Sequence, residues 1–114
     1  MNEADILATT YNHTCTVIRP APVANSHFDD FEMREIYQDV ACAVSFTKGS
    51  FQGQSDTTQS IQYAAILFVR PEIQILAGDR ITARTEGIEI DFLAGEGMHY
   101  PSHNEIPLIR KDDA

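Results

Sequence analysis

Two histidines near the C-terminus come nearest to a chemical site by residue type and spacing. His99 and His103 are four residues apart, the spacing at which a helix presents two metal ligands on one face. Pro101 lies between them, and a proline inside a helix breaks its hydrogen bonding. No third ligand stands at a spacing typical of zinc sites. The sequence therefore predicts no resident metal and no cofactor.

Nucleophiles and acid–base pairs are no better placed for chemistry. Cys15 and Cys42 form no C-x-x-C motif, and the chain has no G-x-S-x-G elbow. The stretches "SFQGQS" and "AGEGMH" match neither a phosphate-binding loop nor a dinucleotide fingerprint. Asp29 and Asp30 are adjacent acids in a predicted loop, where such pairs are usually solvated. We therefore expect a protein that is not an enzyme.

Charge and composition narrow the class further. The 114 residues carry a formal net charge of −9 and eight scattered basic residues, which disfavours a dedicated nucleic-acid binder and is explained most simply by solubility. No apolar run approaches the roughly 18 residues of a membrane helix, and the first ten residues do not resemble a signal peptide. We expect no membrane association, and a cytoplasmic protein whose two cysteines are free thiols. The sequence leaves open whether the two thiols approach each other.

The elements that must position these residues are strands. Residues 11–18 alternate in polarity, with His13 on the inward side as a hydrogen-bonded, partly buried side chain, and Pro20 is predicted to end that strand. Residues 21–31 read as a loop. A long strand follows from Phe31, whose predicted inward residues are Ile36, Val40, Cys42, Val44 and Phe46.

The second half of the chain contains more strands. Residues 61–69 are apolar on both faces, which predicts a central strand that Pro71 ends. A short strand at 72–76, a turn at 77–79 and a strand from Arg80 follow. Residues 80–92 predict a hairpin with its turn at Glu86–Gly87, with Ile81, Ala83, Ile88, Ile90 and Phe92 facing inward. Pro107 predicts that the last strand lies at an edge.

Together these patterns predict one all-β domain over residues 1–114. It has about six to seven strands and at most one short helix, which suits a small antiparallel β-barrel or sandwich. Residues 1–10 are an arm or a frayed helical turn, and residues 111–114 form a charged tail.

A polar connection, residues 48–60, separates two strands that bury apolar side chains. Hairpin connections usually have about two to five residues, and longer ones tend to be functional or disordered. A tolerated insertion is the simple explanation, since lengthening a surface loop costs little entropy. Function is the alternative, because exposed loops and strand edges are typical of interaction modules.

The order of several segments resembles a known family. "DVACAVSF", a polar loop, "ILFVRPEIQILAGDRI", "TEGIEIDF" and "MHYPSHNEIPLI" are similar to the minor capsid and head–tail connector proteins of tailed bacteriophages, most of all to the head-closure or stopper type. The similarity covers roughly residues 35–110. It implies a virion or prophage-particle protein that waits in the bacterial cytoplasm before assembly.

The resemblance also implies partners and candidate residues. Copies of the chain would form a ring between the portal-bound adaptor and the tail, through which packaged DNA passes without specific binding. A loop projecting into the ring would gate the channel through Gly49, Phe51, Gln52, Gly53, Gln54 and Gln59. Candidates for lumen or subunit contacts are Asp29, Asp30, Glu32, Glu89 and Asp91.

Two alternatives come from other classes. One is a small β-barrel metal-binding protein or enzyme that uses His99 and His103. The other is a monomeric peptide- or ligand-binding module in which the 48–60 loop borders a pocket near Phe51.

Overall fold

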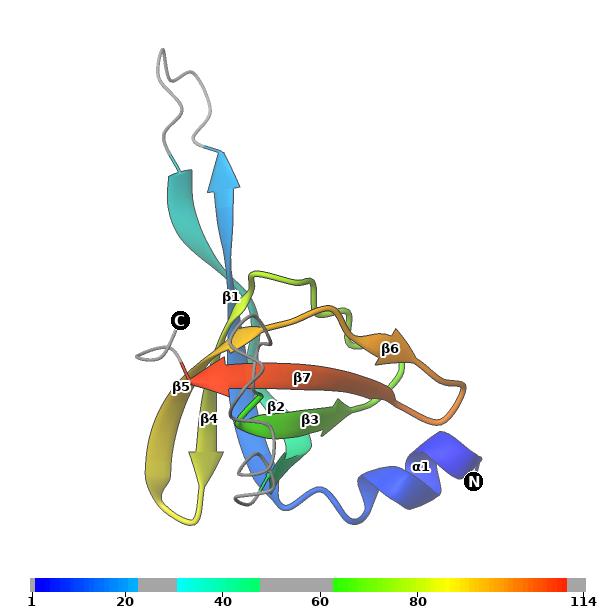
Figure 1. The fold of residues 1–114 in the computed structure, drawn as a ribbon. Helices are drawn as coiled ribbons and strands as arrows, with labels where there is room; N and C mark the ends of the chain where they lie inside the picture. The colour runs from blue at the N-terminus through cyan, green and yellow to red at the C-terminus, as the bar shows by residue number, and fades with distance from the viewer. Residues whose placement is uncertain (1, 23–30, 48–62, 111–114) are drawn as a thin grey trace, which may run out of the picture.

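The computed structural model describes residues 2–22, 31–47 and 63–110 of the chain. These residues form one short helix and seven strands: α1 Glu3–Ala8, β1 His13–Pro22, β2 Phe31–Phe46, β3 Ala65–Val69, β4 Arg80–Thr85, β5 Ile88–Ala94, β6 Met98–His99 and β7 Asn104–Arg110. Figure 1 shows α1 beside a strongly curved sheet. The predicted all-β class is confirmed.

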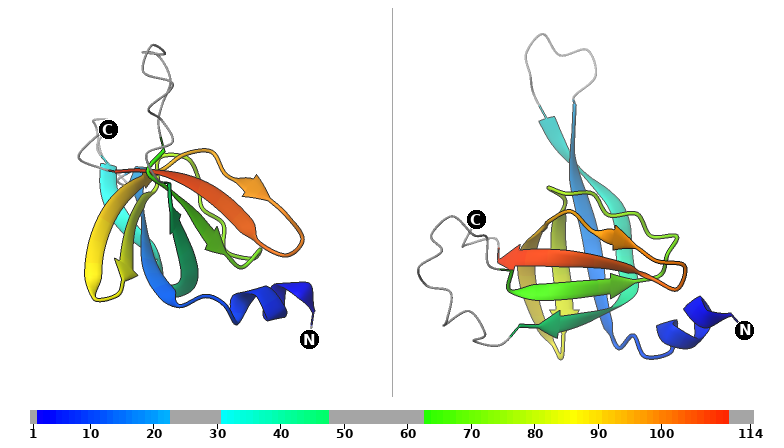
Figure 2. Two further views of the ribbon diagram at one scale, coloured as in Figure 1. Left: turned by 60° about the horizontal axis from the view of Figure 1, so that its bottom comes forward. Right: turned by 45° about the vertical axis from the view of Figure 1, so that its right-hand side comes forward.

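Six of the strands close into an antiparallel barrel. Neighbouring strands follow the order β3–β2–β1–β4–β5–β7, and β7 then pairs with β3. The seventh strand, β6, pairs with β7 outside this ring, at Met98↔Glu105 and His99↔Asn104. Of the two predicted architectures, the structure has the barrel (Figure 2). Closure leaves far fewer free strand edges than an open sheet of this size would have.

Alternate residues of the strands fill the barrel. The largest apolar side chains with less than 2% exposure are Phe92, Leu67, Ile81, Ile106, Leu108, Val17 and Val69. Their spacing of two follows from the alternation of side chains along a strand. β3 is buried at every second residue and paired on both edges, with β2 and with β7, as predicted for a central strand.

The β4–β5 hairpin turns at Glu86–Gly87 as predicted. Both residues have positive φ, 53° and 83°, the backbone that a two-residue turn between twisted strands requires. Ile81, Ala83 and Phe92 are fully buried, as expected. Ile88 is not: it is 60% exposed, because it pairs with Thr85 directly after the turn, at the end of the hairpin.

β2 departs from its predicted alternation. Cys42 and Val44 are buried as predicted, and Phe46, the last residue of the strand, is 45% exposed but still faces the buried Phe92 (ring centroids 6.4 Å apart). Ile36 is 37% exposed, and Tyr37 packs against the core in its place. The β1–β2 register is irregular between Cys15 and Val17 and between Val17 and Ile18, and Asp39 has a φ of 51°. Each extra residue of a bulge moves the following side chains to the other face.

The prediction that Pro20 ends the first strand is wrong. β1 continues to Pro22, and its last four residues pair with Phe31–Arg34 of β2, whereas β4 leaves β1 at Ile18. No third strand accompanies this stretch among the described residues, so no neighbour there needs the missing amide hydrogen. We call residues 19–22 and 31–36 the arm. It projects from the barrel in Figures 1 and 2.

Residues 70–79 cross the barrel without forming a strand, so the predicted strand at 72–76 is wrong. The predicted turn is present, with Gly78 at φ 93° and the Asp79 N–H donating to Leu76 O (3.0 Å). β4 begins at Arg80, as expected. We call residues 70–79 the strap.

β7 is part of the barrel wall and not the predicted edge. It pairs with β3 along Asn104–Leu108 and with β5 along Leu108–Arg110. Pro107 faces Ile66 of β3, and its carbonyl accepts the Gly95 N–H (2.8 Å) on the other side. Because the N–H and C=O of a strand residue point to the same side, the missing donor faces the β5–β6 connection. The proline therefore costs no hydrogen bond to β3.

Helix α1 begins with a capping box, in which the Asn2 side chain accepts the Asp5 N–H and the Asp5 side chain accepts the Asn2 N–H. Ala4 is buried, and Arg70 Nη2 donates to Asp5 Oδ1 (2.8 Å). The predicted arm or frayed turn is thus a capped helix. Within the described ranges, no helix has the length and apolar character to cross a membrane.

Candidate functional site

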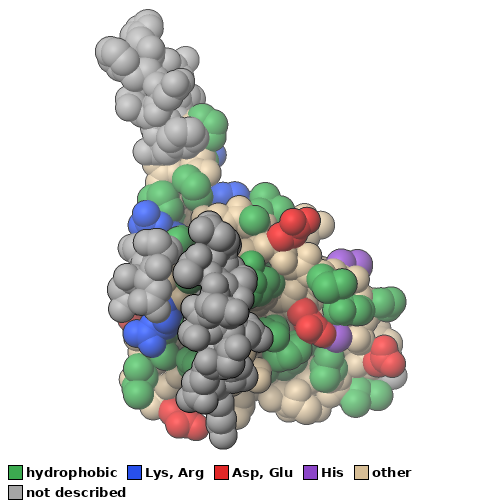
Figure 3. All heavy atoms as spheres, viewed as in Figure 1, with side chains coloured by type: hydrophobic (Ala, Val, Ile, Leu, Met, Phe, Trp, Pro, Cys, Tyr) green, Lys and Arg blue, Asp and Glu red, His purple; other side chains and the backbone are tan. Residues whose placement is uncertain are grey.

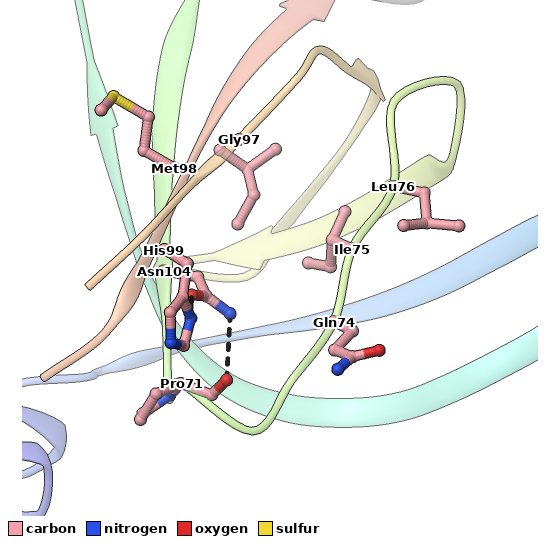
Figure 4. Close-up of a pocket in the computed structure, with 9 residues that line it drawn as sticks. Pro71, Gln74, Ile75, Leu76, Gly97, Met98, His99 and Asn104 are labelled. Atoms are coloured by element: carbon pink, nitrogen blue, oxygen red, sulfur yellow. Dashed lines mark hydrogen bonds between the residues drawn. The ribbon is translucent and has the colours of Figure 1, made fainter. Parts of the chain in front are cut away.

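The strap is fastened to the barrel at both ends. At one end, Asn104 Nδ2 donates to Pro71 O (3.2 Å) and Ile73 O (2.8 Å); Figure 4 shows the Pro71 bond. At the other end, Arg19 makes a bidentate ion pair with Asp79 (2.8 Å for both bonds) and donates to Gln74 O (3.2 Å). Asp79 also accepts the Leu76 N–H (2.9 Å). These bonds fix the strap against the barrel, where Ile73 and Ile75 pack against the core.

A groove lies between the strap and β6. We call it the strap groove; its volume is about 330 Å³, and its lining residues are Pro71, Gln74, Ile75, Leu76, Gly97, Met98, His99, Asn104 and Ile106 (Figure 4). Its rim is apolar and open to solvent: Leu76 and Met98 are 53% and 62% exposed. The strap groove is therefore a preformed surface with unburied apolar side chains.

The chain approaches β7 closely at Gly97, directly before β6. A Cβ at this position would lie 2.9 Å from Glu105 O and 3.0 Å from Ile106 Cγ1, closer than ordinary contact. Only glycine therefore lets the chain run against β7 before Met98. Beyond β7, β6 has no second strand partner among the described residues.

The histidines have their own hydrogen-bond partners. His99 Nδ1 bonds to Asn104 Oδ1 (2.5 Å), and His103 bonds to Ser102 Oγ and Glu105 Oε2 (2.8 Å each) and stacks on Tyr100. His13 accepts the Val44 N–H (3.2 Å) and is half-buried, as predicted. In the part of the chain that the structure describes, no three His, Cys, Asp or Glu residues are grouped to hold a metal ion.

Cys15 and Cys42 do approach each other. Both are buried free thiols on the neighbouring strands β1 and β2. A hydrogen bond with Cys15, together with burial, raises the pKa of the Cys42 thiol well above its ordinary value. Thiols that stay protonated are poor nucleophiles and poor metal ligands, so this pair is suited to packing.

The predicted acidic contact residues are dispersed. Glu32 is in the arm and binds Arg34 (2.9 Å). Glu89 and Asp91 are on the outer face of β5, as expected, where Glu89 accepts from Arg84 (2.7 Å) and Asp91 from Thr82 (2.9 Å). The structure does not gather these three into one site. Asp29 and Asp30 lie outside the described residues, as do Gly49, Phe51, Gln52, Gly53, Gln54 and Gln59.

Sequence reasoning missed the two surfaces that the fold creates, the arm and the strap groove. The sequence does not predict the arm, because Pro20 indicates the end of a strand and because nothing local indicates the bulges of β2. The groove depends on long-range bonds, such as Asn104 to Ile73 and Arg19 to Asp79, which no local pattern predicts. One available signal was Asp79, an acid next to a turn glycine and directly before a buried strand.

Comparison with known proteins finds a similarity of fold only. No family model matches the chain, and no curated protein matches it. The structure is similar to that of the phage-like element PBSX protein xkdH from Bacillus subtilis, with a TM-score of 0.58 and 13% sequence identity. The match covers 90% of this chain and 96% of that one. The two proteins share a fold.

Proposed function

We propose that this chain is a structural subunit of a tailed-phage or prophage-derived particle. The observation that carries the proposal is the likeness of fold, over nearly the whole of both chains, to a protein of a phage-like element. The sequence resemblance to connector proteins over residues 35–110 supports the same role independently of the fold. The proposed role needs no catalytic residue and no cofactor.

Within such a particle, we propose the head-closure or stopper position. Copies of the chain form a ring between the adaptor on the portal and the tail, and the 48–60 connection reaches into the channel. Gly49 and Gly53 allow this segment to bend, and its glutamines offer hydrogen bonds between copies without fixed charge. The surplus of acidic residues suits a conduit that must not hold DNA phosphates.

Loss of the gene tests the role in the particle. In cells that make the particle without this protein, heads are expected to fill with DNA, to remain without tails and then to lose their DNA. A plasmid copy of the gene should restore tailed particles. Mass spectrometry of purified wild-type particles should detect the chain. Its absence from particles whose tails still attach normally would refute the proposal.

Deletion of residues 50–58 tests the gate separately. Heads carrying the shortened chain are expected to release DNA before tail attachment, because the channel stays open. A variant in which the same nine positions are Gly and Ser is the control for length. Unchanged DNA retention by the deletion variant would refute the gate while leaving the connector role intact.

Neutralising Glu89 and Asp91 to Gln and Asn tests the acidic channel. Both side chains are exposed on the outer face of β5. If this face lines the channel, removal of the charges slows DNA ejection, because repulsion between the wall and the phosphates is reduced. An unchanged ejection rate would favour the simpler explanation that the charges keep the protein soluble.

The strap groove supports a second candidate, a monomeric ligand-binding protein. Its volume of about 330 Å³ falls at the lower end of small-molecule sites, and Asn104 and His99 lie in its wall. Thermal-shift screening against small polar and apolar compounds, with metal analysis of untagged protein, discriminates this candidate. A compound that raises Tm in the wild type but not in Leu76→Glu, a change at an exposed groove residue, would favour it over the connector role.

A further inference from the structure

The strap is bonded to both strands of the arm through one residue. The Gln74 N–H donates to Tyr37 Oη (3.2 Å), and Gln74 O accepts from Arg19 Nη2 (3.2 Å). Arg19 begins the arm on β1, and Tyr37 directly follows the arm on β2. The backbone of Gln74 therefore bridges the two strands at the base of the arm.

The same part of the strap is a wall of the strap groove. Gln74, Ile75 and Leu76 all line the groove, and Figure 4 shows them in succession along the strap. The Leu76 N–H donates to Asp79 Oδ2 (2.9 Å), and the same oxygen accepts from Arg19 Nη2 (2.8 Å). The base of the arm and the groove wall are thus joined both by Gln74 and by the Arg19–Asp79 ion pair.

The arm has little other support. A two-stranded hairpin is marginal in water without a third strand or a packed face. β4 pairs with β1 only as far as Ile18, and β3 pairs with β2 only from Ala43, so no third strand accompanies the arm among the described residues. Residues 32–36 are exposed one after another, and Figure 3 shows uncovered hydrophobic and basic side chains along the arm. At its base, the bonds from the strap take the place of a third strand.

The far end of the strap is fastened by one side chain, Asn104. Its Nδ2 donates to Pro71 O and Ile73 O. Because both strap acceptors are carbonyls, they require the NH₂ group of the amide, which leaves Oδ1 to accept from His99 Nδ1 (2.5 Å). In the described part of the chain, β7 pairs with β3, β5 and β6 but with neither strand of the arm. A specific effect of Asn104 on the arm must therefore pass through the strap.

We propose that the strap and the base of the arm open and close as one unit, separately from the barrel. Proteins open locally in cooperative units at a lower free energy than global unfolding, and the barrel ladder is complete without the strap. By reciprocity, a molecule that stiffens the groove wall also orders the arm, and one that holds the arm also shapes the groove. The two surfaces are thus coupled, whether or not the protein is a connector.

Amide hydrogen exchange of the full-length chain, followed by NMR, tests the shared opening. In the wild type, the protected amides of the strap and the arm should have one common protection factor. It should be at least tenfold below that of Leu67, which is in the middle of β3 and reports global unfolding. In Asn104→Ala, which frees the far end of the strap, both sets should exchange faster by the same factor, roughly tenfold, the scale of one to two net hydrogen bonds.

His99→Ala is the matched control for Asn104→Ala. It removes the other hydrogen bond of the same amide but leaves both bonds to the strap, so exchange in the arm should stay at the wild-type rate. If circular dichroism shows that Asn104→Ala is not folded, Asn104→Asp replaces it. That variant keeps the size of the side chain and the His99 bond but turns a carboxylate oxygen towards the two strap carbonyls.

The reverse direction has a test of its own. Tyr37→Phe removes the acceptor of the Gln74 N–H at the arm end of the strap. Exchange should rise roughly two- to fivefold in the arm and also at the Ile73 N–H, which donates to Arg70 O (3.0 Å) near the far end. Tyr100→Phe is the control, because it loses a hydroxyl that bonds to Met98 Sδ (3.7 Å) and leaves Gln74 unchanged.

Several results would overturn the proposal. Faster exchange in the strap of Asn104→Ala with an unchanged arm would show that the arm opens alone. Protection in the arm and strap equal to that of Leu67 would show that they open only with the whole barrel. An effect of His99→Ala as large as that of Asn104→Ala would show that the strap bonds are not the link. All of these measurements use the isolated protein, so failure of the connector role and failure of the coupling are distinguishable.

Discussion

Asp79 is a charged residue with only 1% exposure, and it is tolerated there because of Arg19. The guanidinium meets both carboxylate oxygens at 2.8 Å, the bidentate geometry that best compensates the desolvation of a carboxylate. Hydrogen bonding to Asp79 correspondingly raises the pKa of Arg19. This one pair joins β1, the strap and the start of β4, so it fixes the base of the arm and one end of the groove.

Arg19→Met should therefore destabilise the protein strongly. It leaves a buried carboxylate unpaired, which typically costs about 3–5 kcal/mol, with the lower end expected because the Arg19 side chain is 27% exposed. Arg34→Met is the matched control, since its ion pair is exposed on both sides and should cost no more than about 1 kcal/mol. Urea unfolding at pH 7 measures both. Equal losses would mean that Asp79 is hydrated and does not need Arg19.

The buried thiols lead to a second prediction at this scale. Cys15 and Cys42 are 1% and 0% exposed, and the raised pKa of Cys42 keeps its thiol protonated. Native protein at pH 8 should therefore react with a thiol reagent at least a hundredfold more slowly than Met98→Cys reacts at its added, exposed thiol. The rate should rise with urea in parallel with unfolding. Rapid labelling of the native wild type would show that β1 and β2 separate locally.

Helix α1 illustrates how an element too short to be stable alone is retained. Isolated helices below about 12 residues are marginal in water, and α1 has six. Its capping box and the buried Ala4 contribute, and Arg70 connects it to the end of β3. Arg70 binds Asp5 and Glu72 at 2.8 Å each, and these bonds lower the pKa of both carboxyls.

The lowered pKa values predict a pH dependence for docking of α1. A carboxyl with a lowered folded-state pKa stabilises the folded form fully above its ordinary pKa, 3.8 for Asp5 and 4.5 for Glu72. That contribution is lost as the pH falls through the lowered value. Amide signals of residues 3–8 should thus shift towards random coil below about pH 4 while the barrel signals persist.

Arg70→Gln provides the comparison for α1. NMR titration should show the Asp5 pKa returning towards 3.8, and the helix signals should weaken already at pH 7, more so than in a Glu72→Gln control that keeps the Asp5 bond. An unchanged Asp5 titration in Arg70→Gln would show that Arg70 does not hold the helix.

The elements also show what local patterns can and cannot predict. The hairpin turn at Glu86–Gly87 was predictable because only a few residues accept positive φ, and the buried faces of β3 and β4 followed from alternation. The bulges near Asp39 were not predictable, because nothing local distinguishes a bulge from a regular strand. They turn Ile36 outward and Tyr37 inward, the reverse of the prediction. The predictions for Pro20 and Pro107 rest only on the fact that proline has no amide hydrogen. Whether that costs a hydrogen bond depends on which side of the strand the nitrogen faces and on what lies there, and the sequence does not show this.

At the scale of the whole molecule, barrel closure leaves little free strand edge except along the arm and β6. The β3–β7 seam runs over five residue pairs, so the barrel itself offers little for another chain to extend. The free strand edge lies along the arm and β6, and four of the seven large exposed hydrophobic residues among those described, Met33, Ile36, Leu76 and Met98, lie in the arm or the strap groove. A protein built in this way can remain soluble alone and still associate where many copies are held together.

We therefore predict a monomer in dilute solution. A net charge of −9 makes copies repel one another, and the closed barrel leaves little free strand edge for pairing between copies. Sedimentation at about 10–100 µM should show one species near 12.7 kDa. Added salt screens the repulsion between copies, so weak association should increase between 0.05 and 0.5 M NaCl in the wild type and less so in Met33→Ser. A stable ring in the absence of any partner would contradict this expectation, because copies would then associate in spite of their net repulsion.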